Sequence, residues 1–301
     1  MKAVQPAFLK PGDTVGIIST ARRVSREEIE PAVAWLRHAG LEVILGAHLF
    51  SDSHQFAGTD EERMADLQWA MDHPQIKAIF CARGGYGTPR IVDGIRWDKF
   101  SKAPKWIVGF SDVTVLLQAC YAHGICSLHA PMPLFFSRPE YASSMDKLKE
   151  YLFGNGLALT ADPHPLNRMG EAEGVLLGGN LSLLVNSIGT PSSFQPEGKI
   201  LFLEDIDEYL YHVDRMIVHL KRAGMLQGIS GLVVGHFSDM KDNLVPFGEN
   251  AYEMIRRNVQ EADFPVAFGF PVGHASPNMP LPVGSNVKLN VGEQGTMLDF
   301  S

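Results

Sequence analysis

Ser111 stands where an apolar run gives way to a segment with helical spacing. Trp106–Val108 predicts a buried strand, and the residues from Asp112 to about Ala122 predict a helix. A sharp strand-to-helix turn exposes a serine hydroxyl and directs the first N–H groups of the helix toward the group that the serine attacks. Acyl transfer by a serine nucleophile requires this geometry. The alternative is that Ser111 or Asp112 only caps the helix.

Two further polar residues follow predicted strands, Glu204 and His274. A serine hydroxyl needs a base, usually histidine, and the histidine needs a carboxylate that fixes its tautomer and stabilises the imidazolium. Taken singly, each residue also fits a solvated strand-end acid or a histidine satisfied by loop backbone. Three neighbouring acids are alternatives for the carboxylate role: Asp205, Asp207 and Glu208.

A glycine-rich loop, Arg83–Gly87, follows another predicted strand. Its backbone N–H groups can approach a ligand closely, so Gly84 or Gly85 could complete an oxyanion hole with the N–H of Asp112. A phosphate cradle and a plain tight turn are alternatives, although neither the Walker A pattern nor the dinucleotide-binding fingerprint is present. Arg83 could bind a substrate carboxylate or be a surface charge.

Metal catalysis is a second chemical class to consider. Five residues offer suitable ligand atoms, but no H-E-x-x-H or C-x-x-C spacing accompanies them: His212, Asp214, His219, His236 and Asp239. The missing spacing therefore argues against metal catalysis.

Composition and charge limit the class of protein. The chain has 301 residues, enough for two domains, with 45% hydrophobic and 20% charged residues and a net charge of −8. The negative charge argues against binding to nucleic acid or an anionic membrane. No signal pattern or run of about 18 apolar residues is present. The odd count of 3 cysteines, two of them in apolar runs, fits reduced thiols, and we expect a cytoplasmic protein.

The first half alternates predicted strands and helices, which is typical of a parallel α/β sheet. Strands are predicted at Thr14–Ser19, Leu41–Leu45 and Ile76–Cys81, and helices at Ser25–Ala39 and Thr59–Met71. The second helix begins with Thr59 and Glu62 in capping-box spacing. Ligands on such sheets lie beyond the carboxyl ends of the strands, so the glycine-rich loop and Ser111 are expected to face one crevice. We predict an N-terminal domain over 1–140, a linker over 141–173 and a C-terminal domain over 174–301.

The C-terminal domain repeats this pattern. Its predicted strands are Lys199–Glu204, Ile229–Phe237 and Phe264–Gly273; its predicted helices are Leu181–Ile188, Val213–Ala223 and Ala251–Glu261. The tail, Asn286–Phe300, alternates like a hairpin that turns at Glu293–Gly295.

Together these motifs resemble the LD-carboxypeptidase family of serine peptidases. The segments that carry the resemblance occur in the same order and spacing: Arg83–Gly87, Gly109–Thr114, Gly178–Ser182, Leu203–Asp205 and Gly273–His274. The resemblance implies a flavodoxin-like N-terminal domain with a swivelling C-terminal α/β domain. It also implies a triad of Ser111, His274 and Glu204, and an oxyanion hole formed by Gly85 and Asp112.

The family's main activity is the release of terminal D-alanine from murein tetrapeptides, without a metal or cofactor. The resemblance therefore implies a murein peptide substrate, a homodimer, and no nucleic-acid or membrane partner. We expect Arg83 and Gly84 to contact the substrate. A second branch resembles microcin C immunity peptidases, which cleave acyl adenylates and tend to carry a longer segment with an aromatic residue for the adenine. The corresponding segment here, Thr190–Pro196, offers only Phe194, which favours murein peptide. A non-catalytic peptide-binding protein is the remaining alternative.

Overall fold

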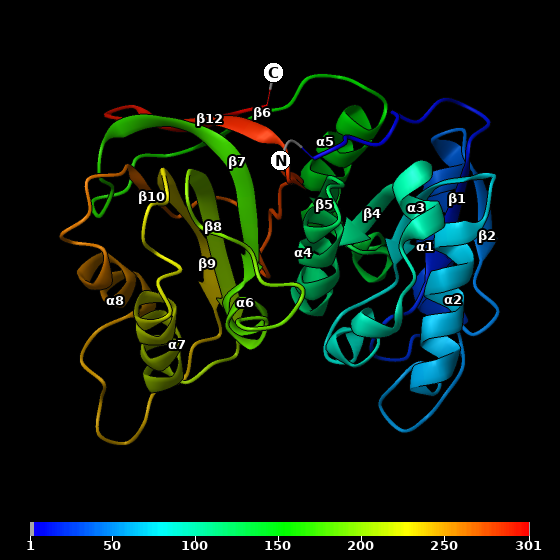
Figure 1. The fold of residues 1–301 in the computed structure, drawn as a ribbon, viewed down its shortest axis with the longest axis horizontal. Helices are drawn as coiled ribbons and strands as arrows, with labels where there is room; N and C mark the ends of the chain where they lie inside the picture. The colour runs from blue at the N-terminus through cyan, green and yellow to red at the C-terminus, as the bar shows by residue number, and fades with distance from the viewer. Residues whose placement is uncertain (1–2, 301) are drawn as a thin grey trace. The chain divides into compact units, whose positions relative to one another are not determined.

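The computed structural model describes residues 3–300, which fold into two compact units (Figure 1). The first unit comprises the chain up to Gly156 together with Met279–Gly284, and the second comprises Leu157–Asn278 together with the chain from Ser285 onward. The segment predicted as a linker contains a helix of the first unit and a strand of the second. The boundaries at 140 and 173 stay a prediction.

The first unit is built on a mostly parallel sheet, as predicted from the strand–helix alternation. Its parallel strands are β1 (Thr14–Ile18), β2 (Glu42–Leu45), β3 (Ile76–Cys81), β4 (Trp106–Gly109) and β5 (Ser127–His129). They lie in the spatial order β2-β1-β3-β4-β5, which is the flavodoxin-like order. The carboxyl ends of β3 and β4, which lead to the glycine-rich loop and to Ser111, are therefore neighbours at one edge of the sheet.

An additional strand, β11 (Leu281–Val283), pairs antiparallel with β5 at the edge of this sheet. No pattern in the sequence predicted this strand. The strand is three residues long and contains Pro282, and proline within sheets is tolerated at edges because it donates no ladder hydrogen bond. A late segment of the chain thus completes the N-terminal sheet.

Helices cover this sheet with their apolar faces. They are α1 (Arg26–His38), α2 (Asp60–Asp72), α3 (Asp98–Lys102), α4 (Thr114–Ala122) and α5 (Ala142–Leu152). Helices α1 and α2 begin with capping boxes in which Ser25 pairs with Glu28 and Thr59 with Glu62, the second of which the sequence predicted. In the described part of the chain, Cys81, Cys120 and Cys126 are buried and form no disulfide.

The second unit has its own mixed sheet, in the order β10-β9-β8-β7-β12-β13-β6. Its strands are β6 (Ala158–Ala161), β7 (Gly170–Asn180), β8 (Lys199–Ile206), β9 (Gly231–Ser238), β10 (Val266–Phe268), β12 (Asn286–Gly292) and β13 (Gly295–Asp299). Strands β7 to β10 are parallel, and β12 and β13 form the predicted C-terminal hairpin. Its helices are α6 (Leu181–Asn186), α7 (Leu210–Arg222) and α8 (Ala251–Asn258).

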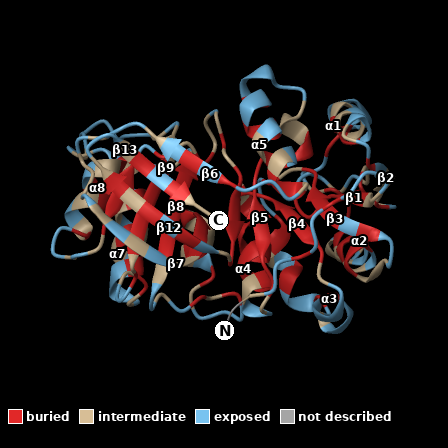
Figure 2. Cartoon of the chain, turned by 90° about the horizontal axis from the view of Figure 1, so that it is seen from above, coloured by how far each residue is buried: buried red, intermediate tan, exposed pale blue. Residues whose placement is uncertain are grey.

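In each unit the core lies between the sheet and its helices. The central strands, such as β3, β4 and β8, are mostly buried, whereas β2, β6 and the first half of β7 are partly exposed, as are the outer faces of the helices (Figure 2). In β8, for example, Ile200 to Leu203 have no exposed surface, which fits a parallel strand covered on both faces. Such rigid strands are suited to holding side chains at their carboxyl ends.

Candidate active site

Ser111 is separated from the end of β4 by Phe110 alone and begins a short 3₁₀ turn, η3 (Ser111–Val113), that leads into α4. Its φ angle is +62°, a left-handed conformation that L-residues other than glycine rarely adopt. The N-cap positions of η3 and α4 are Phe110 and Val113, and neither makes a side-chain cap hydrogen bond. Neither Ser111 nor Asp112 therefore occupies the N-cap position of η3 or α4. A strained serine at a strand-to-helix turn is the geometry of a nucleophile elbow.

The glycine-rich loop lies against this serine. A Cβ atom added to Gly84 would be 3.1 Å from Cβ of Ser111 and 3.3 Å from both Oγ of Ser111 and the backbone nitrogen of Asp112. Gly85 has a φ of +108°, and a Cβ there would lie 2.5 Å from Cδ of Arg22. The loop therefore needs glycine at both positions, one for close approach and one for backbone conformation.

The other predicted residues of this half lie close by. Asp112 is buried, and its Oδ2 accepts a hydrogen bond of 2.8 Å from the backbone N–H of Thr88. Burial raises the pKa of Asp112, although hydrogen bonds from Thr88 and Gly87 oppose the change. Arg83 is half-buried, and its Nη1 donates to the carbonyl of Arg23 at 3.3 Å.

The second unit contains a histidine–carboxylate pair. Nδ1 of His274 lies 2.7 Å from Oε2 of Glu204, whose side chain is fully buried, while that of His274 is 11% exposed. With Nδ1 assigned as the protonated nitrogen, His274 donates to the carboxylate, and its basic nitrogen is Nε2. Of the residues predicted to form a triad, the structure thus pairs Glu204 with His274.

Neither Glu204 nor His274 lies at the end of a strand, where the sequence predicted both residues. β8 continues past Glu204 to Ile206, and its register with β9 shifts between Leu203 and Asp205, so Glu204 lies at a bulge. Bulges redirect side chains and are frequent beside active sites. The predicted strand over Phe264–Gly273 is wrong in extent, since β10 ends at Phe268 and His274 lies in the following loop.

Two residues for which the sequence predicted no role of their own support this loop. The N–H of Gly273 donates to Oδ1 of Asn278, a fully buried side chain, at 2.9 Å. Gly273 has a φ of +123°, and a Cβ there would lie 2.9 Å from both Cβ and Oε2 of Glu204. The short Gly-His pattern gave a signal for Gly273, but Asn278 resembles any polar loop residue.

The alternative carboxylates have other partners. Oδ1 of Asp205 accepts from Nδ2 of Asn180 at 2.9 Å, and Oδ2 accepts from the N–H of Ser182 at 3.0 Å. Asp207 pairs with Lys241 at 2.6 Å, and Glu208 pairs with His212 at 3.0 Å. Asp205 therefore anchors the start of α6.

Two titratable groups, His274 itself and the neighbouring Asp205, have shifted pKa values. Burial alone lowers the pKa of His274, but the charge and hydrogen bond of Glu204 and the charges of Asp205 and Asp239 raise it, so that it lies above its ordinary value. Burial, followed by the nearby charge of Glu204, raises the pKa of Asp205 to about 7. The field of the neighbouring carboxylates thus offsets the desolvation of the imidazolium.

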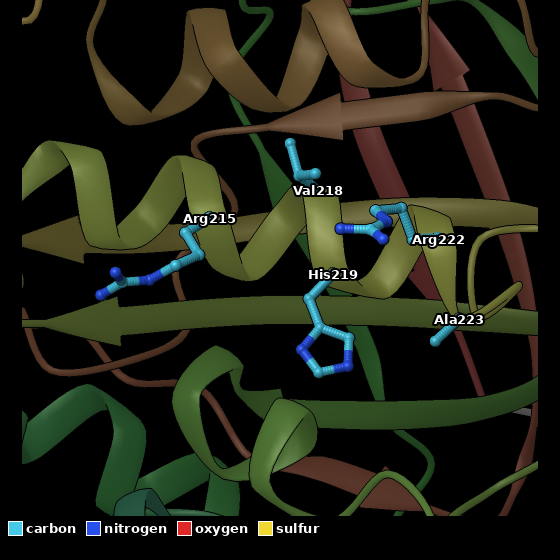
Figure 3. A pocket seen from close by; sticks show the side chains of 5 residues that line it. All are labelled: Arg215, Val218, His219, Arg222 and Ala223. Atoms are coloured by element: carbon cyan, nitrogen blue, oxygen red, sulfur yellow. The ribbon is translucent and has the colours of Figure 1, made fainter.

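The residues considered for a metal site do not converge. His219 lines a surface hollow of about 420 Å³ on α7 together with Arg215, Val218, Arg222 and Ala223, and the side chains of Arg215 and His219 point in different directions (Figure 3). His212 contacts Glu208 instead. Among residues 3–300, no group of three or more His, Cys, Asp or Glu side chains is arranged to hold a metal ion.

Comparison with known families defines the class of protein. The sequence matches the LD-carboxypeptidase N-terminal domain over residues 15–130 and the LD-carboxypeptidase C-terminal domain over residues 173–289. The chain therefore belongs to the LD-carboxypeptidase family, and it is a peptidase. Within the described residues, no helix is both long enough and apolar enough to cross a membrane.

Individual relatives are similar over nearly the whole chain. A probable murein peptide carboxypeptidase of Bacillus subtilis is 34% identical, over 98% of this chain and 94% of its own. The crystal structure of a muramoyltetrapeptide carboxypeptidase from Oxalobacter formigenes has a TM-score of 0.88 at 31% identity, covering 96% of this chain and 98% of that one. Microcin C7 self immunity protein MccF in complex with aspartyl sulfamoyl adenosine has a TM-score of 0.87 at 22% identity, covering 99% and 98%. This last likeness concerns the fold alone.

Proposed function

We propose that this peptidase is a serine LD-carboxypeptidase that releases the terminal D-alanine from murein tetrapeptides. The observation that carries the proposal is the buried hydrogen bond between Glu204 and His274, because such a pair makes a histidine an effective general base. The strained backbone of Ser111 at the turn after β4 adds a matching nucleophile. The names of the relatives from Bacillus subtilis and Oxalobacter formigenes support the substrate class.

In the proposed reaction, Oγ of Ser111 attacks the carbonyl carbon before the terminal D-alanine, and Nε2 of His274 takes the hydroxyl proton. The N–H groups of Asp112 and Gly85 hold the oxyanion of the tetrahedral intermediate, and Glu204 stabilises the imidazolium. Collapse of the intermediate transfers the proton to the nitrogen of D-alanine, which leaves as the amine. Water, activated by His274, then hydrolyses the acyl-enzyme. Arg83 and Gly84 contact the substrate in this proposal.

In the proposed reaction, Ser111 and His274 act on one substrate. Loss of either residue should therefore have a similar effect, because members of a triad act as a unit and their contributions are not additive. Ser111→Ala, His274→Ala and the double variant should each lose several orders of magnitude in kcat. A double variant that loses far more than either single variant would contradict a shared step.

The direct experiment supplies the purified chain with a murein tetrapeptide and measures free D-alanine by chiral chromatography. We expect turnover by the wild type and none above background by Ser111→Ala. Ser143→Ala, which removes an exposed hydroxyl on α5, is the matched control and should keep full activity. Release of D-alanine by Ser111→Ala at the wild-type rate would disprove the proposed nucleophile.

The same assay compares the murein peptide with the substrate class of the microcin branch. Phe194, the aromatic residue considered for an adenine contact, is only 5% exposed, which favours the murein peptide. Aspartyl sulfamoyl adenosine should therefore be cleaved much more slowly than the tetrapeptide. Tight binding of either compound without turnover would instead indicate a non-catalytic binding protein.

The family resemblance also leads us to propose a cytoplasmic homodimer. Light scattering would test the homodimer by measuring the mass of the protein in solution.

A further inference from the structure

A buried guanidinium donates hydrogen bonds to the backbone at the end of the loop between β3 and η1 (Thr88–Arg90). Arg63, on α2, has no exposed surface, and its Nη1 donates to the carbonyl of Thr20 at 2.7 Å and to the carbonyl of Gly87 at 3.0 Å. Its Nη2 pairs with Asp60. A buried charge is tolerated only when it is paired and hydrogen-bonded, so this side chain fixes the backbone that it contacts.

The same loop is held on its other side by a buried carboxylate. Oδ2 of Asp112 accepts from the N–H of Thr88, and Oγ1 of Thr88 donates to Oγ1 of Thr20, at 2.9 Å. The carbonyl of Thr20 is in turn bound by Arg63. Arg63 thus holds carbonyl groups and Asp112 an N–H group of one continuous network, formed by Thr20, Arg63, Gly87, Thr88 and Asp112.

There is little space for the loop to move within this network. A Cβ atom added to Gly87 would lie 2.6 Å from Nη1 of Arg63 and 2.9 Å from Cα of Ala21. At the other end of the loop, Gly84 lies against Ser111 and the backbone nitrogen of Asp112. The position of the glycines relative to Ser111 therefore depends on Arg63 and on the Asp112 carboxylate.

We propose that the side chains of Arg63 and Asp112 are positioning residues for the oxyanion hole beside Ser111. This inference rests on the proposed function, in which the N–H groups of Gly85 and Asp112 bind the oxyanion. Asp112 then has two roles. Its backbone N–H donates to the oxyanion, and its carboxylate aligns the loop that supplies the second donor. Arg63 touches neither substrate nor Ser111 and acts only through the loop.

A positioning role and a purely structural role predict different kinetics. The oxyanion forms only in the transition state, so a displaced donor lowers kcat and leaves substrate binding nearly unchanged. Loss of one oxyanion donor costs about 10²- to 10³-fold in kcat, and a displacement of about 1 Å costs on the order of 10²-fold. A mainly structural residue would instead lower the amount of folded protein.

The test compares Asp112→Ala with Asp112→Asn and Arg63→Met with Arg63→Lys. The readouts are kcat and KM for the tetrapeptide, and the rate at which a fluorophosphonate labels Ser111, a reaction that also develops charge on an oxygen in the oxyanion hole. We expect the Ala and Met variants to lose about 10²-fold in kcat and in labelling rate, with KM within about threefold. Asn, which can still accept from Thr88, and Lys, which keeps the charge, should restore at least tenfold of this loss.

Leu67→Ala is the control for stability, because Leu67 is a fully buried residue of the same helix, α2, and has no part in the network. It should lower the stability of the protein and leave both rates unchanged. Rate losses in Asp112→Ala and Arg63→Met that are no greater than in Leu67→Ala, or that fall on KM alone, would overturn the inference. Should Arg63→Met not fold, the Asp112 pair and Arg63→Lys still decide it.

The labelling rate separates this inference from the proposed function. If the wild type labels at Ser111 but releases no D-alanine, the proposed substrate is wrong, and the labelling rates of the variants still decide whether Arg63 and Asp112 position the hole. If the wild type does not label at Ser111, both proposals fail.

Discussion

Oε2 of Glu204 lies 2.7 Å from Nδ1 of His274, although the two residues are 70 positions apart in the sequence. Both side chains are withdrawn from solvent, so their interaction is screened little by salt. A carboxylate in this position selects the tautomer with the proton on Nδ1 and stabilises the imidazolium as it forms.

Glu204→Gln should therefore lower kcat by about 10⁴-fold, because an amide neither stabilises the imidazolium nor enforces the reactive tautomer. Steady-state release of D-alanine measures this effect. Asp207→Asn is the matched control, since Asp207 pairs with Lys241 at 2.6 Å and lies three residues away in the sequence. If Asp207→Asn lost as much kcat as Glu204→Gln, the assignment of the carboxylate role to Glu204 would be wrong.

The pH dependence of kcat/KM should follow His274, which acts as a base only when neutral. Its pKa lies above the ordinary value of about 6.5, so activity should rise with pH and reach half its plateau above that value. Asp239→Asn removes one of the charges that raise this pKa and should move the midpoint to lower pH. A midpoint well below 6.5 in the wild type, or no shift in the variant, would contradict this assignment.

Gly273→Ala should disrupt the histidine–carboxylate pair without changing either member. The new Cβ would lie 2.9 Å from Oε2 of Glu204, and the φ of +123° is unfavourable for alanine. We expect kcat to fall by about 10²-fold or more, with about 1–3 kcal/mol of destabilisation from the backbone conformation.

Gly224→Ala separates the clash at Gly273 from the backbone strain. Gly224 also has a positive φ, +78°, but a Cβ there would approach only the side chain of Gln227, at 3.8 Å. This variant should lose stability and keep its activity, as measured by urea unfolding and by D-alanine release. Equal losses of kcat in the two glycine variants would mean that strain, not displacement of Glu204, causes the effect.

The sequence was sufficient to predict the features that depend on local patterns. Apolar runs bounded by turn residues identified β1 and β3, and capping-box spacing identified the start of α2 at Thr59. The change from strand to helix around Ser111 was visible for the same reason. The α/β class of the first unit followed from the alternation of these elements.

Features that depend on long-range pairing could not be predicted in this way. The end of β8 was missed because Glu204 and Asp205 are charged, and their burial is compensated by His274 and Asn180, which are distant in sequence. The edge strand β11 is too short to show a periodicity. In the sequence, Arg63 resembles an exposed helix residue, because the carbonyl groups of Thr20 and Gly87 that it binds are distant along the chain.

The buried carboxylate of Asp205 should make the stability of the protein depend on pH. Its pKa is raised to about 7 in the folded state, so between about pH 4 and pH 7 the folded protein binds more protons than the unfolded chain. The free energy of unfolding should therefore fall as the pH rises through this window, by at most about 1.4 kcal/mol per pH unit for one proton.

Asp205→Asn keeps the size of the side chain and can still accept hydrogen bonds, but it does not titrate. Urea unfolding followed by circular dichroism should show a smaller loss of stability from pH 4 to pH 7 in this variant than in the wild type. Asp162→Asn, which changes an exposed aspartate of the second unit, should leave the wild-type pH dependence in place. If Asp205→Asn and the wild type lose the same stability over this range, Asp205 is ionised throughout, and the stabilising effect of its hydrogen bonds from Asn180 and Ser182 outweighs its burial beside Glu204.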